Sequence, residues 1–185
     1  MKKILPLFIL LFFATTLYAG RDNLYERFKD YYEIKVFLKD VIDETKNPDV
    51  KTDVFRDVFT DALMERINIK FIPVDNENDA DVIVRARIKE YVFTEEPLPV
   101  RAAPVFINAI SIIADTAEPK SAGRLAVDYE IQGPRDDKIL FSYKKLTTEA
   151  RKPRPDMKGE MGYIHALREN INRFIFRAFY KQKKR

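Results

Sequence analysis

The chain has 185 residues, with 33 lysines and arginines against 29 aspartates and glutamates, one histidine, no cysteine and no tryptophan. This length is typical of one domain, and 46% hydrophobic residues supply enough apolar surface for a core. The lack of cysteine excludes disulfides, thiol nucleophiles, cysteine-ligated zinc and a lipid-modified cysteine, and a single histidine excludes a multi-histidine metal site.

The first segment, residues 1–19, predicts a secretory signal peptide. Lys2 and Lys3 precede an apolar run from Ile4 to Phe13, and small and polar residues follow up to Ala19. An uncleaved membrane anchor is the alternative, but the run is shorter than the roughly 20 apolar residues that a spanning helix needs. We therefore expect an exported protein, located in the periplasm or at the periplasmic face of the outer membrane.

A short lead-in and a strand follow the signal peptide. Residues 20–32 are charged and aromatic, with room for one or two helical turns. From Glu33 the pattern changes to period two, which predicts a strand with one buried face formed by Ile34, Val36 and Leu38. The polar stretch 43–48 ends in Asn-Pro and predicts a turn.

The next segment predicts an amphipathic helix over about residues 50–66. Asp49 is placed to cap it, and apolar residues recur at spacings of three and four up to Ile67. Phe55 and Phe59 on its apolar stripe are expected to pack against a sheet.

A short strand over residues 69–74 leads into an acidic loop at 75–79. Its alternating carboxylates resemble a calcium-binding loop, but Ala80 and Ala86 stand where that pattern requires Gly and Glu. No metal site and no cofactor are predicted.

Residues 80–93 give the clearest strand pattern. Apolar residues alternate on one face (Val82, Val84, Ala86, Ile88), and the other face carries Ile83, Arg85, Arg87, Lys89 and Tyr91. One hypothesis is that the three basic residues dock an anionic partner, such as lipid headgroups or lipopolysaccharide phosphate. The other is that they pair across strands with Asp128 and Glu130.

An apolar insertion at 97–119 separates this strand from the next. It has prolines on both sides and is too long for an ordinary connection. Its candidate partner-binding residues are Val105, Phe106, Ile107, Ile110 and Ile113. They form either a short helix tucked onto the domain or a hydrophobic patch that a partner covers.

A hairpin and a final helix complete the predicted domain. Residues 123–148 form the hairpin, which buries Leu125, Val127, Tyr129 and Ile131. Asp156 is placed to cap the helix. The helix carries an apolar stripe interrupted by Arg168: Met161, Ile164, Leu167, Ile171, Phe174, Ile175, Ala178 and Phe179.

Basic residues are concentrated at the end of the sequence. Lys181, Lys183, Lys184 and Arg185 lie in or beside the tail 182–185, whereas residues 20–180 carry 27 basic against 29 acidic residues. A nucleic-acid-binding domain would carry a basic face rather than a basic tail, so no nucleic-acid partner is expected. The tail either contacts anionic lipid or is a solvated helix end.

Catalytic motifs are scarce. His165 is the one residue suited to proton transfer near neutral pH, and it lies on the flank of the last helix. The five glycines form no nucleophile elbow, phosphate-binding loop or dinucleotide fingerprint. We expect a protein that is not an enzyme, although a paired-carboxylate hydrolase is compatible with the composition.

The order of elements resembles a pattern of exported envelope families. A strand leads to the turn Asp43-Glu44-Thr45, a helix containing Phe59 to Leu63 follows, and the strand from Ala80 to Ile88 comes after it. Over about residues 33–150 the chain resembles the small lipopolysaccharide-assembly lipoprotein and the periplasmic domain of curli-secretion-channel proteins. The resemblance implies an α/β two-layer sandwich, a non-enzymatic assembly role and protein partners. Those families carry a lipid-modified cysteine after the signal peptide, which this chain lacks.

Together these patterns predict one α/β domain over residues 33–181, with a mixed sheet of four or five strands and two long helices on one face. We expect an envelope assembly or scaffold protein, in lipopolysaccharide or secretion-channel assembly, that binds its partner through the insertion 97–119 and the open sheet face. The alternative is a periplasmic lipid- or glycan-binding carrier.

Overall fold

Strands and helices alternate along the chain in the predicted order. A computed structural model describes residues 24–95, 121–134, 138–152 and 159–181. Its elements are α2 (Tyr25–Phe28), β1 (Glu33–Asp43), α3 (Thr52–Met64), β2 (Lys70–Pro73), the 3-10 turn η1 (Glu77–Asp79), β3 (Val82–Glu95), β4 (Ser121–Gln132), β5 (Ile139–Lys152) and α4 (Gly159–Phe179). The predicted signal peptide, most of the lead-in, the insertion 97–119 and the tail 182–185 lie outside the described residues.

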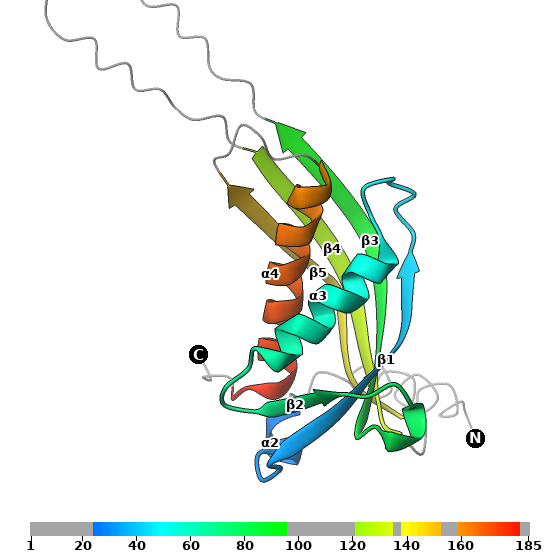
Figure 1. Ribbon diagram of the computed structural model, residues 1–185, viewed down its shortest axis with the longest axis vertical. Coiled ribbons are helices and arrows are strands. Elements are labelled where there is room, and N and C mark those ends of the chain that lie inside the picture. The colour runs from blue at the N-terminus through cyan, green and yellow to red at the C-terminus, as the bar shows by residue number, and fades with distance from the viewer. Residues whose placement is uncertain (1–23, 96–120, 135–137, 153–158, 182–185) are drawn as a thin grey trace, which may run out of the picture.

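The strands form one mixed sheet with the order β2-β1-β3-β4-β5 (Figure 1). β1 is parallel to both β2 and β3, and α3 supplies the crossover that a parallel β1–β2 pair requires. β3, β4 and β5 form an antiparallel meander, which confirms the hairpin predicted over 123–148.

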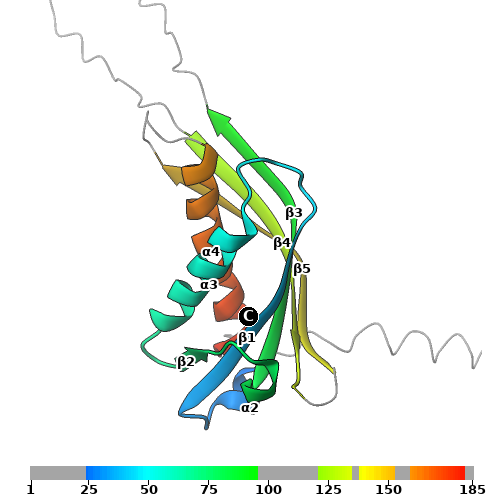
Figure 2. The ribbon, with the colours of Figure 1, turned by 45° about the vertical axis from the view of Figure 1, so that its right-hand side comes forward.

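Both long helices lie on the same face of the sheet (Figures 1 and 2). α3 packs on β1 and β2, α4 packs on β4 and β5, and the two helices contact each other. No described helix covers the other face, which the turned view in Figure 2 shows edge-on. This arrangement confirms the predicted two-layer sandwich. α2 joins the core at one end, because the Leu24 N–H donates to the Ala178 carbonyl at 2.7 Å.

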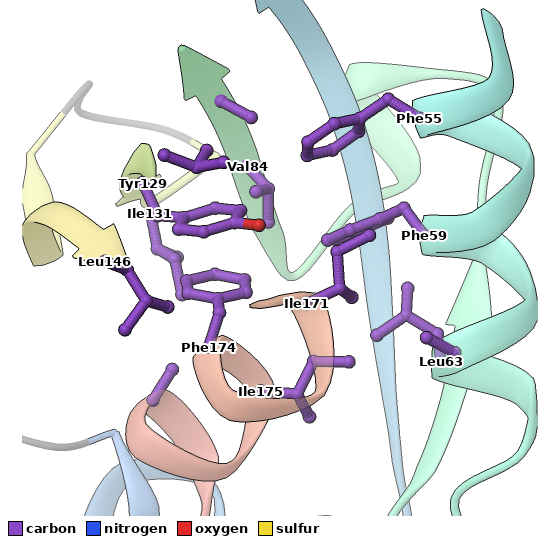
Figure 3. Close-up of a cluster of buried hydrophobic side chains, with 14 of the residues drawn as sticks. Phe55, Phe59, Leu63, Val84, Tyr129, Ile131, Leu146, Ile171, Phe174 and Ile175 are labelled. Carbon is purple, nitrogen blue, oxygen red and sulfur yellow. The ribbon is translucent and has the colours of Figure 1, made fainter. Parts of the chain in front are cut away.

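Aromatic side chains fill the space between the two layers (Figure 3). Phe174 of α4 stacks on Tyr129 of β4, with ring centroids 4.0 Å apart and an interplanar angle of 11°. Phe55 and Phe59 of α3 point into the same cluster, so their predicted role in the core is confirmed. Such rings bury large apolar areas and account for much of the stability of the layer interface.

A polar network lies inside this core. The Tyr129 hydroxyl donates to Asn170 Oδ1 at 2.9 Å. Asn170 Nδ2 donates to the Leu146 carbonyl at 2.7 Å and to the Thr148 hydroxyl at 3.0 Å. Thr148 Oγ1 in turn donates to the Ala166 carbonyl at 3.1 Å. These groups avoid the free-energy cost of burying an unpaired polar atom because each has a partner.

The limits of α3 differ from the prediction. The helix begins at Thr52 rather than at residue 50, and its N-cap is Lys51 without a side-chain hydrogen bond, so the predicted Asp49 cap is wrong. The Asp49 N–H instead donates to Asn47 Oδ1 at 2.9 Å, which forms a turn ahead of the helix. The helix ends at Met64, so Ile67 lies in the following loop and is 97% exposed.

The buried stripe of α4 is rotated from the predicted one. Met161 is 42% exposed, and Gly162 and Tyr163 face the sheet in its place. The first turn of α4 approaches the sheet closely, because a Cβ added to Gly162 would lie 2.5 Å from the Phe93 ring. Only glycine therefore fits this position. The predicted Asp156 cap lies outside the described residues.

A bulge in β3 also changes one predicted orientation. Ile88 pairs with Val127 and Glu90 with Ala126, so Lys89 is an extra residue in the ladder. The bulge reverses the alternation beyond it. Tyr91 therefore faces the helices, is 5% exposed and contacts Tyr163, and its predicted place on the basic face is wrong.

Candidate partner-binding face

The three predicted basic site residues lie together on the uncovered face of the sheet. Val84, Ala86 and Ile88 are buried toward the helices, so strand alternation turns Arg85, Arg87 and Lys89 to the opposite face. Their side chains are 37%, 51% and 31% exposed. The sequence pattern therefore identified a real cluster of cations.

Carboxylates of the neighbouring strands pair with this cluster. Arg85 Nε lies 3.4 Å from Asp40 Oδ2, and Arg87 Nε lies 3.2 Å from Glu44 Oε1. Lys89 Nζ lies 2.5 Å from Glu44 Oε2 and 3.9 Å from Asp128 Oδ2. Cross-strand pairing was predicted with Asp128 and Glu130 of β4, but the shortest contacts come from β1.

The missed partners follow from the position of β1. The sequence does not reveal that β1 lies between β2 and β3, or that its register changes between Leu38 and Asp40. That irregularity turns Asp40 and Glu44 onto the uncovered face beside the β3 cations. A register pattern of this kind depends on pairing between distant segments, so no local sequence feature could have shown it.

A second set of ion pairs extends the face toward β5. Glu90 lies 3.7 Å from Arg124 Nε and 3.9 Å from Lys145 Nζ. Lys145 has a φ of 53° and its N–H donates to Asp128 Oδ1 at 2.6 Å, which fixes a bulge in β5. We call the set Asp40, Glu44, Arg85, Arg87, Lys89, Glu90, Arg124, Asp128, Glu130 and Lys145 the charged face.

One end of the charged face contains a polar group that the sequence did not indicate. Gln132 is 6% exposed and pairs with Ile83 across β3 and β4. Its Nε2 donates to Glu130 Oε1 at 2.6 Å. Its Oε1 is buried and has no hydrogen-bond partner within the described residues.

The predicted apolar site residues, Val105, Phe106, Ile107, Ile110 and Ile113, lie outside the described residues. The structure does place both ends of the insertion that carries them. The β3–β4 ladder continues to the pair Glu95↔Ser121. Residues 96 and 120 therefore leave the sheet from neighbouring strands.

A pocket of about 280 Å³ lies between α3 and the β1–β2 pair. Its lining is mainly apolar: Val36, Phe37, Leu38, Phe59, Leu63, Pro73 and Val74, with Arg56, Thr60 and Asp75. The Arg56 guanidinium donates to the Leu38 and Lys39 carbonyls at 3.0 and 3.2 Å, so it supports the irregular part of β1. The volume is just under the ordinary range of small-molecule sites, roughly 300–1,000 Å³.

Groups suited to catalysis are not assembled in the described part of the chain. No group of three or more His, Asp or Glu side chains there could hold a metal ion. His165 is half-buried on α4. Burial raises the pKa of Tyr129 and Tyr163, so both hydroxyls stay protonated at neutral pH and serve as hydrogen-bond donors.

Fold and site define this chain as a two-layer α/β sandwich with a charge-paired, uncovered sheet face. No helix among the described residues is long and apolar enough to cross a membrane. No family model and no curated protein matches the sequence. The resemblance to the two envelope families therefore stays a prediction.

Solved structures of similar fold include bacterial envelope proteins of low sequence identity. A PelC dodecamer variant from Paraburkholderia phytofirmans is 8% identical, with a TM-score of 0.47 over 80% of this chain and 89% of that one. Protein XCC0632 from Xanthomonas campestris, of family DUF330, is 10% identical, with a TM-score of 0.45 over 79% and 85%. Lipoprotein GNA1162 from Neisseria meningitidis is 10% identical, with a TM-score of 0.38 over 77% and 97%. Likeness at this level assigns the chain to none of these families.

Proposed function

We propose that this chain is a non-enzymatic assembly or scaffold protein of the cell envelope, exported to the periplasm. It binds a protein partner through the insertion 97–119 and the adjoining charged face. The observation that carries the proposal is the β3–β4 stem, which remains paired out to Glu95 and Ser121 and so holds both ends of an apolar insertion at one end of the sheet.

The insertion is unusual for a hairpin connection. It contains the run VFINAISII, whereas a connection exposed to water is ordinarily short and polar. Exposed apolar patches of this kind are typical of sites that a partner covers. A partner that covers it also reaches the upper part of β3, where pairing with β1 ends at Ile88 and the strand continues to Glu95.

The charged face favours a protein over a polyanion. Arg85, Arg87 and Lys89 lie among four carboxylates, those of Asp40, Glu44, Asp128 and Glu130, so this part of the face sums to −1. A lipopolysaccharide phosphate would have to displace these ion pairs. A protein surface with its own alternating charges can match them in register, which contributes specificity and association rate.

The interior favours a scaffold over a lipid or glycan carrier. The space between sheet and helices is filled by stacked rings and by the satisfied Asn170 network. A carrier would need an apolar cavity there that could enclose a ligand.

The first test captures partners by crosslinking in intact cells, followed by affinity purification and mass spectrometry. A variant with Val105, Phe106, Ile107, Ile110 and Ile113 replaced by Ser should lose at least about tenfold of the captured partner, as loss of buried anchor residues predicts. Its thermal unfolding midpoint should match that of the wild type. A matched control replaces Met64 and Ile42, which are 60% and 45% exposed, by Ser and should retain the partner.

The second test exchanges one ion pair. Asp40→Arg combined with Arg85→Asp keeps an internal pair but reverses the displayed charges, so partner capture should fall while stability is retained. Capture of the same partner by both the insertion variant and the exchanged variant would contradict the proposal. A native mass spectrum showing retained lipid or glycan would support the carrier instead.

A further inference from the structure

Several large apolar side chains are exposed at the end of the domain where α2 meets the last turns of α4 (Figure 1). Tyr31, Tyr32 and Phe176 are 52%, 83% and 50% exposed, and Ile67 is 97% exposed. We call these four residues the basal surface. They account for four of the nine strongly exposed large hydrophobic residues in the described part of the chain.

Contacts along α2, β2 and α4 place these residues at one end. The Phe28 ring lies 5.1 Å from Tyr31 and 6.1 Å from Phe179. Phe179 also contacts Phe71 of β2, at 5.1 Å. Lys70 Nζ, which begins β2, lies 5.6 Å from the Tyr32 ring.

The remaining two members adjoin this cluster. Ile67 lies three residues before β2, in the loop after α3. Arg66 in that loop donates to Asn172 of α4, one helical turn before Phe176, and Phe176 stacks on Tyr180 at 5.7 Å. The basal surface is therefore one region rather than four scattered side chains.

Positive charge surrounds the basal surface. Residues 173–185 contain six basic residues and no acidic one: Arg173, Arg177, Lys181, Lys183, Lys184 and Arg185. Arg173 and Lys181 are exposed on the end of α4, and Lys70 lies over Tyr32. Aromatic side chains next to a run of cations are typical of surfaces that sit in the headgroup region of a bilayer.

Both ends of the described chain meet at this surface. The hydrogen bond from Leu24 to Ala178 fixes the point where residues 1–23 join the domain, beside the last turn of α4. If the apolar run Ile4 to Phe13 is retained, it attaches to this end, and if it is removed the basal surface is unchanged. The insertion stem at Glu95 and Ser121 lies at the opposite end of the sheet (Figure 1).

We propose that the basal surface lies against a membrane surface that carries anionic lipid headgroups. The aromatic rings insert at the interface and residues 181–185 contact the headgroups, so the insertion stem points away from the bilayer. The orientation goes beyond the proposed function, because it holds whether or not a protein binds the insertion.

The absence of tryptophan gives a direct test. The exported chain is prepared as Tyr32→Trp and as the matched control Val92→Trp, since Val92 is 42% exposed near the insertion stem. Each is mixed with vesicles of phosphatidylcholine alone or in equal parts with phosphatidylglycerol. Emission of the Tyr32→Trp variant should shift to shorter wavelength, and brominated lipid should quench it, only with the anionic vesicles. Emission of the Val92→Trp variant should not change.

A binding measurement complements the fluorescence. Tyr31, Tyr32 and Phe176 replaced together by Ser should reduce the fraction that sediments with anionic vesicles by about tenfold, because apolar burial at the interface is lost. Val92 and Met161 replaced by Ser should sediment like the wild type. High salt should also reduce binding, because the headgroup contacts are screened.

Defined results overturn the inference. These are a chain that ignores anionic vesicles, equal shifts at positions 32 and 92, equal binding to neutral and anionic vesicles, or crosslinks from position 32 to a protein rather than to lipid in cells. Partner capture through the insertion is measured separately, so either proposal can fail while the other stands.

Discussion

The face of the sheet that α3 and α4 cover and the face that they leave open are stabilised by different interactions. On the covered face, stacked rings such as Phe174 on Tyr129 exclude water, and the polar groups among them are paired. On the charged face, side chains such as Arg87 and Glu44 remain half-exposed and pair across strands. The same β-strands supply both faces.

This difference separates stability from recognition. Burial of apolar area contributes most of the folding free energy, whereas exposed ion pairs contribute about 0–1 kcal/mol each. Substitutions on the covered face should therefore affect folding, and those on the charged face should affect binding. The following predictions test that separation in order of decreasing effect.

The largest effect is expected from Phe174→Ala. Phe174 is 1% exposed and contacts Tyr129, Phe59 and Phe141. Removing its ring should lower the free energy of unfolding by about 3–5 kcal/mol through lost burial and a cavity. Urea titration followed by circular dichroism measures the change. Phe176→Ala, two residues along the helix, is the control and should cost less than about 1 kcal/mol; equal losses would contradict the comparison.

Asn170→Leu tests whether the interior polar network is needed. The substitution leaves the Tyr129 hydroxyl and the Leu146 carbonyl without their partner inside the core. We expect the free energy of unfolding to fall by about 1–3 kcal/mol, since the desolvation cost of those groups is no longer offset. Asn172→Leu, on the α3-facing side of the same helix, serves as the control. A stabilised Asn170→Leu protein would show that the network is dispensable.

The covered face was largely predictable from the sequence. Period-two patterns placed Val84, Ala86, Val127 and Ile131 in the core, and the three- and four-residue spacing did the same for Phe59. These patterns follow from the geometry of one strand or one helix, so they need no knowledge of distant segments.

The errors arise where distant segments determine the outcome. The bulge at Lys89 exists because of pairing with β4, and it moved Tyr91 to the covered face. Asn170 interrupts an apolar stripe and looks like a surface residue until Tyr129 and Leu146 supply its partners. The cations Arg85 and Arg87 were identified, but their partners Asp40 and Glu44 come from β1, whose place in the sheet no local pattern reveals.

Alkaline pH offers a further test of the covered face. Burial raises the pKa of Tyr129 and Tyr163 above the ordinary value of 10.0. Above that pH the unfolded chain releases protons that the folded chain retains, so stability present at neutral pH falls as pH rises. Each tyrosine should contribute a loss of about 1.4 kcal/mol per pH unit until its folded pKa is reached.

Urea titrations below and above the ordinary tyrosine pKa measure that slope. Tyr129→Phe should reduce the slope by one proton, although it also lowers stability at neutral pH because the bond to Asn170 is lost. Tyr31→Phe, at a 52% exposed position, should leave the slope unchanged. An unchanged slope in Tyr129→Phe would mean that this hydroxyl titrates normally.

The smallest effect is expected on the charged face. Arg85 and Asp40 lie 3.4 Å apart with side chains 37% and 49% exposed, and the buried Arg85 Nε makes no well-aligned hydrogen bond. A double-mutant cycle with Arg85→Ala and Asp40→Ala should therefore give a coupling energy below about 1 kcal/mol that decreases with added salt. A coupling of several kcal/mol, insensitive to salt, would mean that the charged face stabilises the fold as the aromatic core does. The separation between folding and binding would then fail at the residues proposed to meet the partner.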